Sequence, residues 1–346
     1  MHSRVASAAV AVALASLGVH AQDGVSQVLN ACHVSPIVED LDRTARFYHE
    51  LLGMDLMPPP PSGPLPVDTD PGHLLLHGMP GARLRFIQAR IPGVRCGIEL
   101  VEFTNVDRAA IHRRYQDPGA AVLVLTVRNV DAAFAALKKA AVRIVTTGGV
   151  PVQTTTSEVT PARAVTVLDP DGHYIELIQP AVLPETAVAA SSNVIGIGLR
   201  LTVADAEKSV AFYRALLGIG GRIRAFETNR ERLALAGLPE SATYRSAAIP
   251  IPGSSRTLEL VEFRDAGSRT LAVPSRVQDP GSYRLQLTFR DIGAALDTFK
   301  RFGLGPITTG GAPIAMTFGG GRPWHLAIVP DPSNLFLIVQ QAPSQG

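Results

Sequence analysis

Apolar positions along the chain follow two periods, and these periods predict alternating strands and helices. Residues 30–37 and 97–103 are largely apolar runs of strand length, which favours buried strands. Between them, residues 41–52 have apolar side chains at spacings of three and four, as one face of a helix requires. Gly53 follows directly and is the residue type that most often ends a helix. The pattern therefore predicts a β-α-β-β-β unit.

The same order of elements returns in the next part of the chain. Residues 121–127 predict a strand, residues 130–141 a helix with an apolar stripe, and residues 173–179 the last strand of a second unit. Residues 57–73 interrupt the first unit with seven prolines, which cannot continue a central strand. We expect this insertion to form a stiff loop near the edge of the sheet.

Both units then recur, because the second half of the chain repeats the first. The segment VEDLDRTARFYHELLG (38–53) matches VADAEKSVAFYRALLG (203–218), and IELVEF (98–103) matches LELVEF (258–263). The order of the matches is preserved, and their offset changes only from 165 to 160 residues. This pattern indicates a tandem duplication with four units in all.

The length and composition of the chain agree with two packed domains. At about 150 residues per domain, 346 residues suggest two domains. The repeat places them at residues 28–181 and 193–342, with a linker over residues 182–192. Hydrophobic residues make up 46% and charged residues 18%, which favours a packed core. The net charge is +2, so neither nucleic acid nor an anionic membrane surface is an expected partner.

Residues 1–21 have the pattern of a secretory signal peptide. Arg4 precedes a short apolar run, and a small-x-small cleavage pattern ends at Ala21. The run is shorter than the ~20 residues that a helix needs to cross a bilayer, and an uncleaved anchor is the alternative. We expect an exported mature protein, periplasmic or extracellular, with no membrane span. Its two cysteines, Cys32 and Cys96, are either joined in a disulfide or free and buried.

Two motifs carry a resemblance to a known family. The pattern H-V-x-x-x-V-x-D-L-x-x-x-x-x-F-Y-x-x-L-L-G spans residues 33–53, and DPDGHYIEL spans residues 169–177. Together they resemble the vicinal oxygen chelate superfamily, and the likeness extends over residues 28–342. That superfamily includes glyoxalase I, extradiol dioxygenases, methylmalonyl-CoA epimerase and the fosfomycin- and bleomycin-resistance proteins. The resemblance implies an α+β fold, in which four βαβββ units form two tandem domains with curled mixed sheets, as a monomer or homodimer.

The resemblance also implies where a metal would bind. In this superfamily, paired units curl into a cup that holds a divalent metal, with ligands from the first and last strands of each unit. The corresponding positions are His33, Glu99, Val122 and Glu176 in the first domain and Gly198, Glu259, Arg284 and Ile338 in the second.

His33, Glu99 and Glu176 are therefore the expected metal ligands, and imidazole with carboxylates suits Zn, Mn, Fe, Co or Ni. A carboxylate in an apolar strand is also costly to bury unless it is paired or binds a metal. Val122 stands where the resemblance gives extradiol dioxygenases a second histidine, which argues against oxygen-activating iron. The three expected ligands can meet in one site only if the two units of the first domain share a cup. Cups shared between domains would separate Glu176 from His33 and Glu99.

Three functions remain open from the sequence. The first is a metal-dependent lyase or isomerase that acts on a small oxygen-rich substrate, with Glu99 or Glu176 as a catalytic carboxylate. The second is a metal-free protein that binds a small molecule, as the bleomycin-resistance members do, with Arg284 paired to an anionic ligand. The third is a structural exported protein. Glu99 has a structural alternative too, because Glu259 persists where the other ligands are missing.

Overall fold

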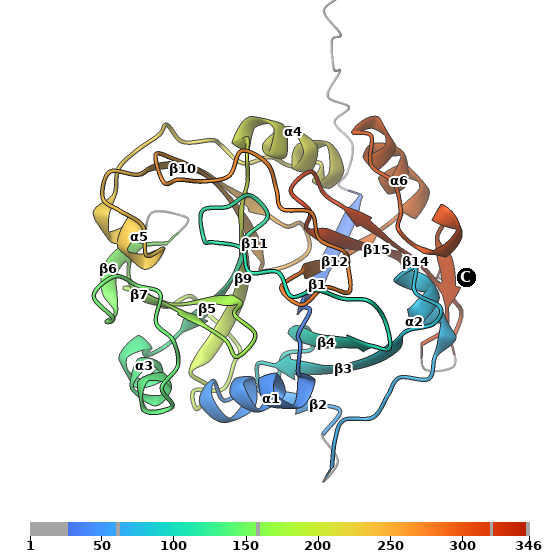
Figure 1. Ribbon diagram of the computed structural model, residues 1–346, viewed down its shortest axis with the longest axis horizontal. Coiled ribbons are helices and arrows are strands. Elements are labelled where there is room, and N and C mark those ends of the chain that lie inside the picture. Colours follow the sequence, from blue (N-terminus) through green and yellow to red (C-terminus); the bar gives the residue numbers. More distant parts are fainter. Residues whose placement is uncertain (1–26, 60–62, 157–159, 319–320, 344–346) are drawn as a thin grey trace, which may run out of the picture.

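The protein folds into two curled β-sheets that lie side by side, with helices around them (Figure 1). The computed structural model describes residues 27–59, 63–156, 160–318 and 321–343. The predicted signal peptide, residues 1–21, lies outside these ranges. In the described part of the chain, no helix is long and apolar enough to cross a membrane.

The first sheet combines strands from the two ends of the chain. Its order is β13-β14-β15-β12-β1-β4-β3-β2, so the blue and red strands of Figure 1 meet in one sheet. The bounds of its strands are β1 (Val28–Pro36), β2 (Asp55–Met57), β3 (Arg83–Arg90), β4 (Ile98–Thr104), β12 (Tyr283–Phe289), β13 (Ile314–Met316), β14 (Trp324–Pro330) and β15 (Phe336–Gln341).

The second sheet is built from the middle of the chain. Its order is β10-β11-β9-β5-β8-β7-β6, and both sheets mix parallel and antiparallel pairs, as the α+β prediction requires. The bounds of its strands are β5 (Ala121–Val127), β6 (Val152–Thr155), β7 (Pro161–Leu168), β8 (Tyr174–Pro180), β9 (Val194–Thr202), β10 (Thr243–Pro250) and β11 (Thr257–Arg264).

Each sheet pairs units from different halves of the repeat. β1 lies antiparallel to β12, with Ser35 opposite Arg284, and β5 lies antiparallel to β9, with Val122 opposite Arg200. The first unit therefore shares a sheet with the fourth, and the second unit with the third. We call the concave face of the first sheet cup 1 and that of the second sheet cup 2. This shared pairing is one of the two arrangements that the sequence left open.

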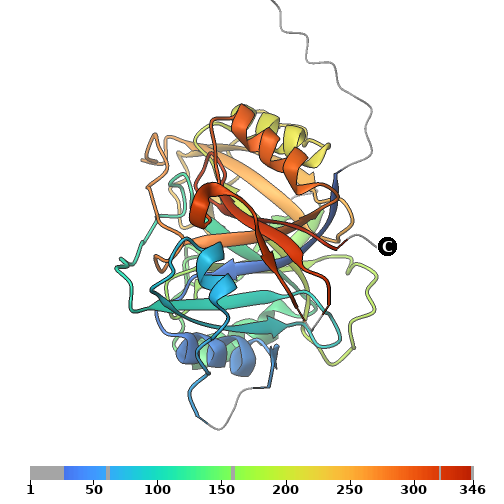
Figure 2. The same cartoon turned by 90° about the vertical axis from the view of Figure 1, so that its right-hand side faces the viewer.

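The described chain has six α-helices, of which four pack on the outside of the cups and two lie inside them. Helices α1, α3, α4 and α6 contribute to one large apolar cluster with strands of both sheets, and α4 and α6 lie side by side (Figure 2). Helices α2 and α5 belong to smaller apolar clusters within cup 1 and cup 2. Their bounds are α1 (Leu41–Arg46), α2 (Pro71–Leu76), α3 (Val130–Lys139), α4 (Ala206–Leu217), α5 (Arg230–Leu235) and α6 (Ile292–Arg301).

The predicted elements match this fold closely, with one exception. The helix predicted over 41–52 is α1 continued by a π-helical turn, Phe47–Leu51. The proline-rich insertion lies at the sheet edge formed by β2, as expected. Its last residues are not loop, however, because Asp70 caps a helix and Pro71 occupies the first helical position, where its missing N–H does no harm.

A buried tyrosine and an Asp-Pro turn join the two halves of each repeat. The Tyr213 hydroxyl of α4 donates to the Asp331 carboxylate at 2.7 Å, and the Tyr48 hydroxyl donates to Asp169 at 3.4 Å. Asp331 also accepts from the backbone N–H groups of its own turn. The Phe-Tyr and Asp-Pro motifs that carried the family resemblance therefore stabilise the fold.

Tyr213→Phe is expected to destabilise the protein in a pH-dependent way. Burial raises the pKa of Asp331 from its ordinary 3.8 to about 6, so folding favours the protonated carboxyl and stability falls as pH rises through this interval. Loss of the tyrosine hydrogen bond should cost about 1 kcal/mol at pH 4 and about 2 kcal/mol at pH 8, where the carboxylate is charged. Urea denaturation at both pH values measures this. Tyr48→Phe, with its longer bond, is the matched control and should cost less.

Candidate ligand-binding site in cup 1

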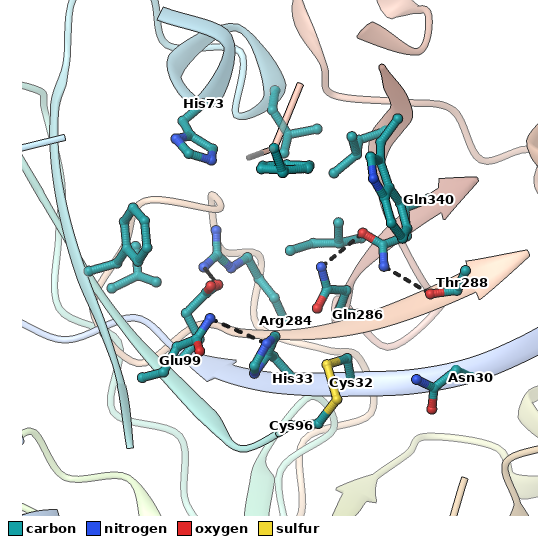
Figure 3. Close-up of a pocket in the computed structure, with 18 of the residues that line it drawn as sticks. Asn30, Cys32, His33, His73, Cys96, Glu99, Arg284, Gln286, Thr288 and Gln340 are labelled. Carbon is teal, nitrogen blue, oxygen red and sulfur yellow. Dashed lines mark hydrogen bonds and ion pairs between the residues drawn. A yellow bond between two sulfur atoms is a disulfide. The ribbon is translucent and has the colours of Figure 1, made fainter. Parts of the chain in front are cut away.

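Cup 1 contains a cavity of about 640 Å³ between the sheet and helix α2 (Figure 3). One wall is aromatic and includes Phe86, Phe318 and Trp324. The floor includes Arg284 from β12, and Gln286 from the same strand also lines the cavity. A volume of this size is typical of sites for small organic ligands, which lie in the range of about 300–1,000 Å³.

Arg284 lies on the floor of this cavity and is 2% exposed. One terminal nitrogen donates to the Glu99 carboxylate at 3.1 Å, and the other donates to Nε2 of His77. His77 can accept because its Nδ1–H donates to the His73 carbonyl oxygen at 2.6 Å, which leaves a lone pair on Nε2. Burial and the guanidinium keep the pKa of His77 well below its usual value, so this imidazole is neutral. The Arg284 Nε–H is buried and has no hydrogen-bond partner among the described residues.

His33 and Glu99 both lie in cup 1, as the resemblance implied. Nδ1 of His33 faces the Gly97 N–H at 3.3 Å, and Nε2 lies 3.3 Å from the Gln88 amide nitrogen. Burial lowers the pKa of His33, so its imidazole is also neutral near pH 7. The Glu99 carboxylate accepts from Ser35 at 3.2 Å in addition to Arg284. Both predicted ligands are therefore engaged by neighbouring protein groups.

Glu176 lies in cup 2, where a buried arginine binds it. Arg200 donates to the Glu176 carboxylate at 3.0 Å from Nη2 and to Glu259 at 2.6 Å from Nε. Arg232 donates to the other oxygen of Glu259 at 2.7 Å, and the Tyr115 hydroxyl accepts from Arg200 at 2.7 Å. Glu176 is fully buried and borders a space of only about 10 Å³, whereas Arg200 and Glu259 also line a second cavity of about 450 Å³. The Glu176 carboxylate itself is therefore enclosed by side chains.

The three expected metal ligands do not come together. His33 and Glu99 lie on the first sheet and Glu176 on the second, because each cup is shared between the two halves of the chain. Within the described residues, no group of three or more His, Cys, Asp or Glu side chains is placed to hold a metal ion. Each cup instead places a guanidinium beside its carboxylates, and this fixed positive charge would repel a divalent cation. The donor set does not fit a metal.

A chain of side-chain amides also lines the cup 1 cavity. Gln286 donates to the Gln340 side-chain oxygen at 2.9 Å, and Gln340 donates to the Thr288 hydroxyl at 2.8 Å. This direction leaves the Gln286 side-chain oxygen as the terminal acceptor. That oxygen is buried and has no partner in the described part of the molecule.

Cys32 and Cys96 form a disulfide, which settles the question that the sequence left open. Both cysteines line the cavity, next to His33 and Arg95. The bond joins β1 to the segment before β4, and so fixes one rim of cup 1 (Figure 3).

Residues 32–177 match the model of the Glyoxalase/Bleomycin resistance protein/Dioxygenase superfamily, so this part of the chain is assigned to that superfamily. Glyoxalase I from Zea mays has a similar fold, with a TM-score of 0.54 and 18% identity over 92% of each chain. A Bacillus subtilis protein provisionally assigned as a dioxygenase gives a TM-score of 0.52 and 12% identity, over 92% of this chain and 87% of that one. No curated protein sequence is significantly similar to the chain.

Two groups of functional interest were not among the site residues predicted from the sequence. Arg200 lies two residues after Gly198 on the same face of β9, and the visible signal was a lone arginine in the apolar strand VIGIGLRLT. His73 and Asp68 lie in the proline-rich insertion, which α2 brings to the mouth of cup 1. Arg284, which the sequence identified, is the one candidate that both lines a large cavity and has an unpartnered buried donor.

Proposed function

We propose that cup 1 binds a small organic anion without a metal. The observation that carries this proposal is Arg284, whose guanidinium lies beside Glu99 on the floor of a cavity of about 640 Å³. Arginine binds carboxylates through paired, fixed hydrogen bonds.

The charge of the cavity supports an anionic ligand. Three arginines, Arg90, Arg95 and Arg284, line it against one carboxylate, Glu99, while the lining residue His33 is neutral. This balance leaves an excess of positive charge in a partly enclosed space, where charges interact more strongly than in bulk water.

The shape of the cavity narrows the class of ligand further. The aromatic wall of Phe86, Phe318 and Trp324 favours a planar or apolar body, and the side-chain amide of Asn30, which lines the same cavity, favours a hydroxyl or amino group. We infer a small aromatic or unsaturated carboxylic acid that has a hydrogen-bond donor. The metal-dependent lyase or isomerase has less support, because it needs His33, Glu99 and Glu176 in one site.

We also infer that the protein is exported, as its N-terminal pattern predicts. The Cys32–Cys96 disulfide supports this, because disulfides persist mainly in oxidising compartments. Removal of residues 1–21 should abolish export, and fractionation of cells that express both forms measures the result.

The single tryptophan of the chain, Trp324, lines cup 1 and provides a direct test. Titration with 4-hydroxybenzoate, a planar carboxylate with a hydroxyl donor, should quench its fluorescence in a saturable way. The same curve is expected after treatment with EDTA. Arg284→Lys should weaken binding at least about tenfold, because lysine lacks the forked donors. Quenching that disappears with EDTA and returns with added metal would contradict the proposal.

Equivalent threonines of the two cups offer a matched pair of variants. Thr288 lines the cavity of cup 1, and Thr126 lines a separate cavity of about 450 Å³ in cup 2. Thr288→Phe should fill cup 1 and reduce 4-hydroxybenzoate affinity more than about tenfold, since the added ring occupies ligand space. Thr126→Phe should leave the affinity unchanged. Equal losses in both variants would place the site elsewhere.

A further inference from the structure

His73 lies at the mouth of the cup 1 cavity with an acidic partner behind it. Its Nδ1 hydrogen-bonds to the Asp68 carboxylate, while Nε2 has no hydrogen-bond partner among the described residues. The ring lies edge-on to Phe86 at 5.6 Å between ring centres and lies 6.2 Å from Phe318. The carboxylate favours the tautomer with the proton on Nδ1, so Nε2 carries the free lone pair of a base.

Helix α2 connects this histidine to the arginine on the floor of the cavity. The His73 carbonyl oxygen accepts from His77, and His77 accepts from Arg284. His73 and Arg284 line the same cavity and lie on opposite sides of it in Figure 3. A ligand oxygen bound by Arg284 would therefore place the rest of the ligand between the guanidinium and the imidazole.

We propose that His73 is a general acid–base that transfers protons to and from carbon in the ligand of cup 1, with Asp68 as its positioning residue. This inference rests on the proposed function, since it needs a ligand bound at Arg284. To the proposed ligand binding, the inference adds a reaction, proton transfer at carbon, and a class of substrate. The substrates are carbon acids, in which a C–H bond is next to a carbonyl or carboxylate group.

The proposed step balances without any co-reactant. Nε2 of His73 takes the proton from carbon, and the electron pair of the C–H bond moves to form an enolate. Arg284 stabilises the negative charge that develops on the enolate oxygen. The imidazolium then returns this proton to a conjugated carbon of the ligand, which gives a double-bond isomer.

Glu99 is the other basic group in the cavity, and its contacts make it a weaker candidate. Its Oε2 accepts from both Arg284 and Ser35, so its charge is already neutralised by protein donors. His73 has its lone pair free, and it receives from Asp68 the support that orients an imidazole base in other acid–base pairs.

The experiment uses 5-nitrobenzisoxazole, a planar carbon acid that reports on a positioned base. Loss of its ring C–H proton to a base breaks the N–O bond and gives a coloured nitrophenolate with a nitrile group. The aromatic wall of cup 1 suits its ring, and Arg284 suits the phenolate oxygen. The full chain should follow saturation kinetics and exceed the rate with an equal concentration of free imidazole.

Three variants assign the roles. His73→Gln should lower kcat about 100-fold, and added imidazole should restore part of the rate. Asp68→Asn should lower kcat about tenfold with little change in KM, and Asp68→Glu should recover most of that loss, because it restores the carboxylate partner. His325→Gln is the control, since His325 is exposed on β14 and is not among the cavity-lining residues.

Measuring binding and reaction rate in the same variants tests acid–base catalysis separately from the proposed ligand binding. Each variant is also titrated with 4-hydroxybenzoate through Trp324 fluorescence, and binding is expected to persist in His73→Gln. If binding persists but His73→Gln reacts as fast as the wild type, or the wild type is no faster than imidazole, acid–base catalysis is overturned and ligand binding stands. If 4-hydroxybenzoate does not bind the wild type, the proposed function fails first.

Discussion

Arg200→Met is expected to lower the free energy of unfolding by about 3–5 kcal/mol, because it leaves two buried carboxylates without their shared cation. Glu176 and Glu259 both accept from Arg200, and both are buried. Methionine fills a similar volume but neutralises neither charge. Urea denaturation at pH 7 with far-UV circular dichroism measures the loss.

The cost of Arg200→Met should shrink in acid. Burial alone would raise the pKa of Glu259, but Arg200 and Arg232 outweigh it and keep this pKa below its usual value. A lowered folded-state pKa gives stability that is present above the unfolded value and is lost as pH falls through the folded one. Arg200→Met removes most of this pH-dependent stabilisation. The free energies of unfolding of the wild type and the variant should therefore converge near pH 3.

A double variant serves as the control for this interpretation. When Glu176→Gln is added to Arg200→Met, the remaining carboxylate, Glu259, still pairs with Arg232, and a large part of the stability should return. A loss below about 1 kcal/mol in Arg200→Met alone would show that the network contributes little, and would reopen this part of cup 2 to another role.

Reduction of the Cys32–Cys96 disulfide is expected to have the second large effect on stability. The bond closes a loop of 64 residues, and the loss of such a constraint on the unfolded chain corresponds to about 4 kcal/mol. Urea denaturation with and without a phosphine reductant measures it. The double variant Cys32→Ala, Cys96→Ala should start from the lower stability and no longer respond to the reductant. An equal response in both proteins would show that the reductant acts elsewhere.

Local features of the fold were predictable because each depends on a short stretch of sequence. The spacing of apolar residues located α1 and α3, and the repeated segments located all four units. The pairing of the units was not predictable in this way. Strands such as β1 and β5 have similar apolar patterns, and either could lie beside several partners with equal burial of its side chains.

In the candidate site, too, individual residues could be predicted from the sequence, but their contacts with distant residues could not. Arg284 and Glu99 were both identified from the sequence, but their ion pair joins residues 185 positions apart. The change from Glu176 to Ile338 at equivalent strand positions also has a structural reason. Glu176 is buried in cup 2, where it pairs with Arg200, whereas Ile338 lines the cavity of cup 1, where Arg284 already has Glu99 as its partner.

The second sheet uses strands from the middle of the chain and the first sheet uses strands from both ends, so the two cups can form at different times during synthesis. Cup 2 uses only strands from residues 121–264, which leave the ribosome well before the end of the chain. β1 must wait for its partner β12, and β12 for its partner β15, which are made last, and such distant pairings form slowly. A chain that stops before its last quarter therefore has no cup 1, and the ligand binding proposed for this cup requires the finished molecule.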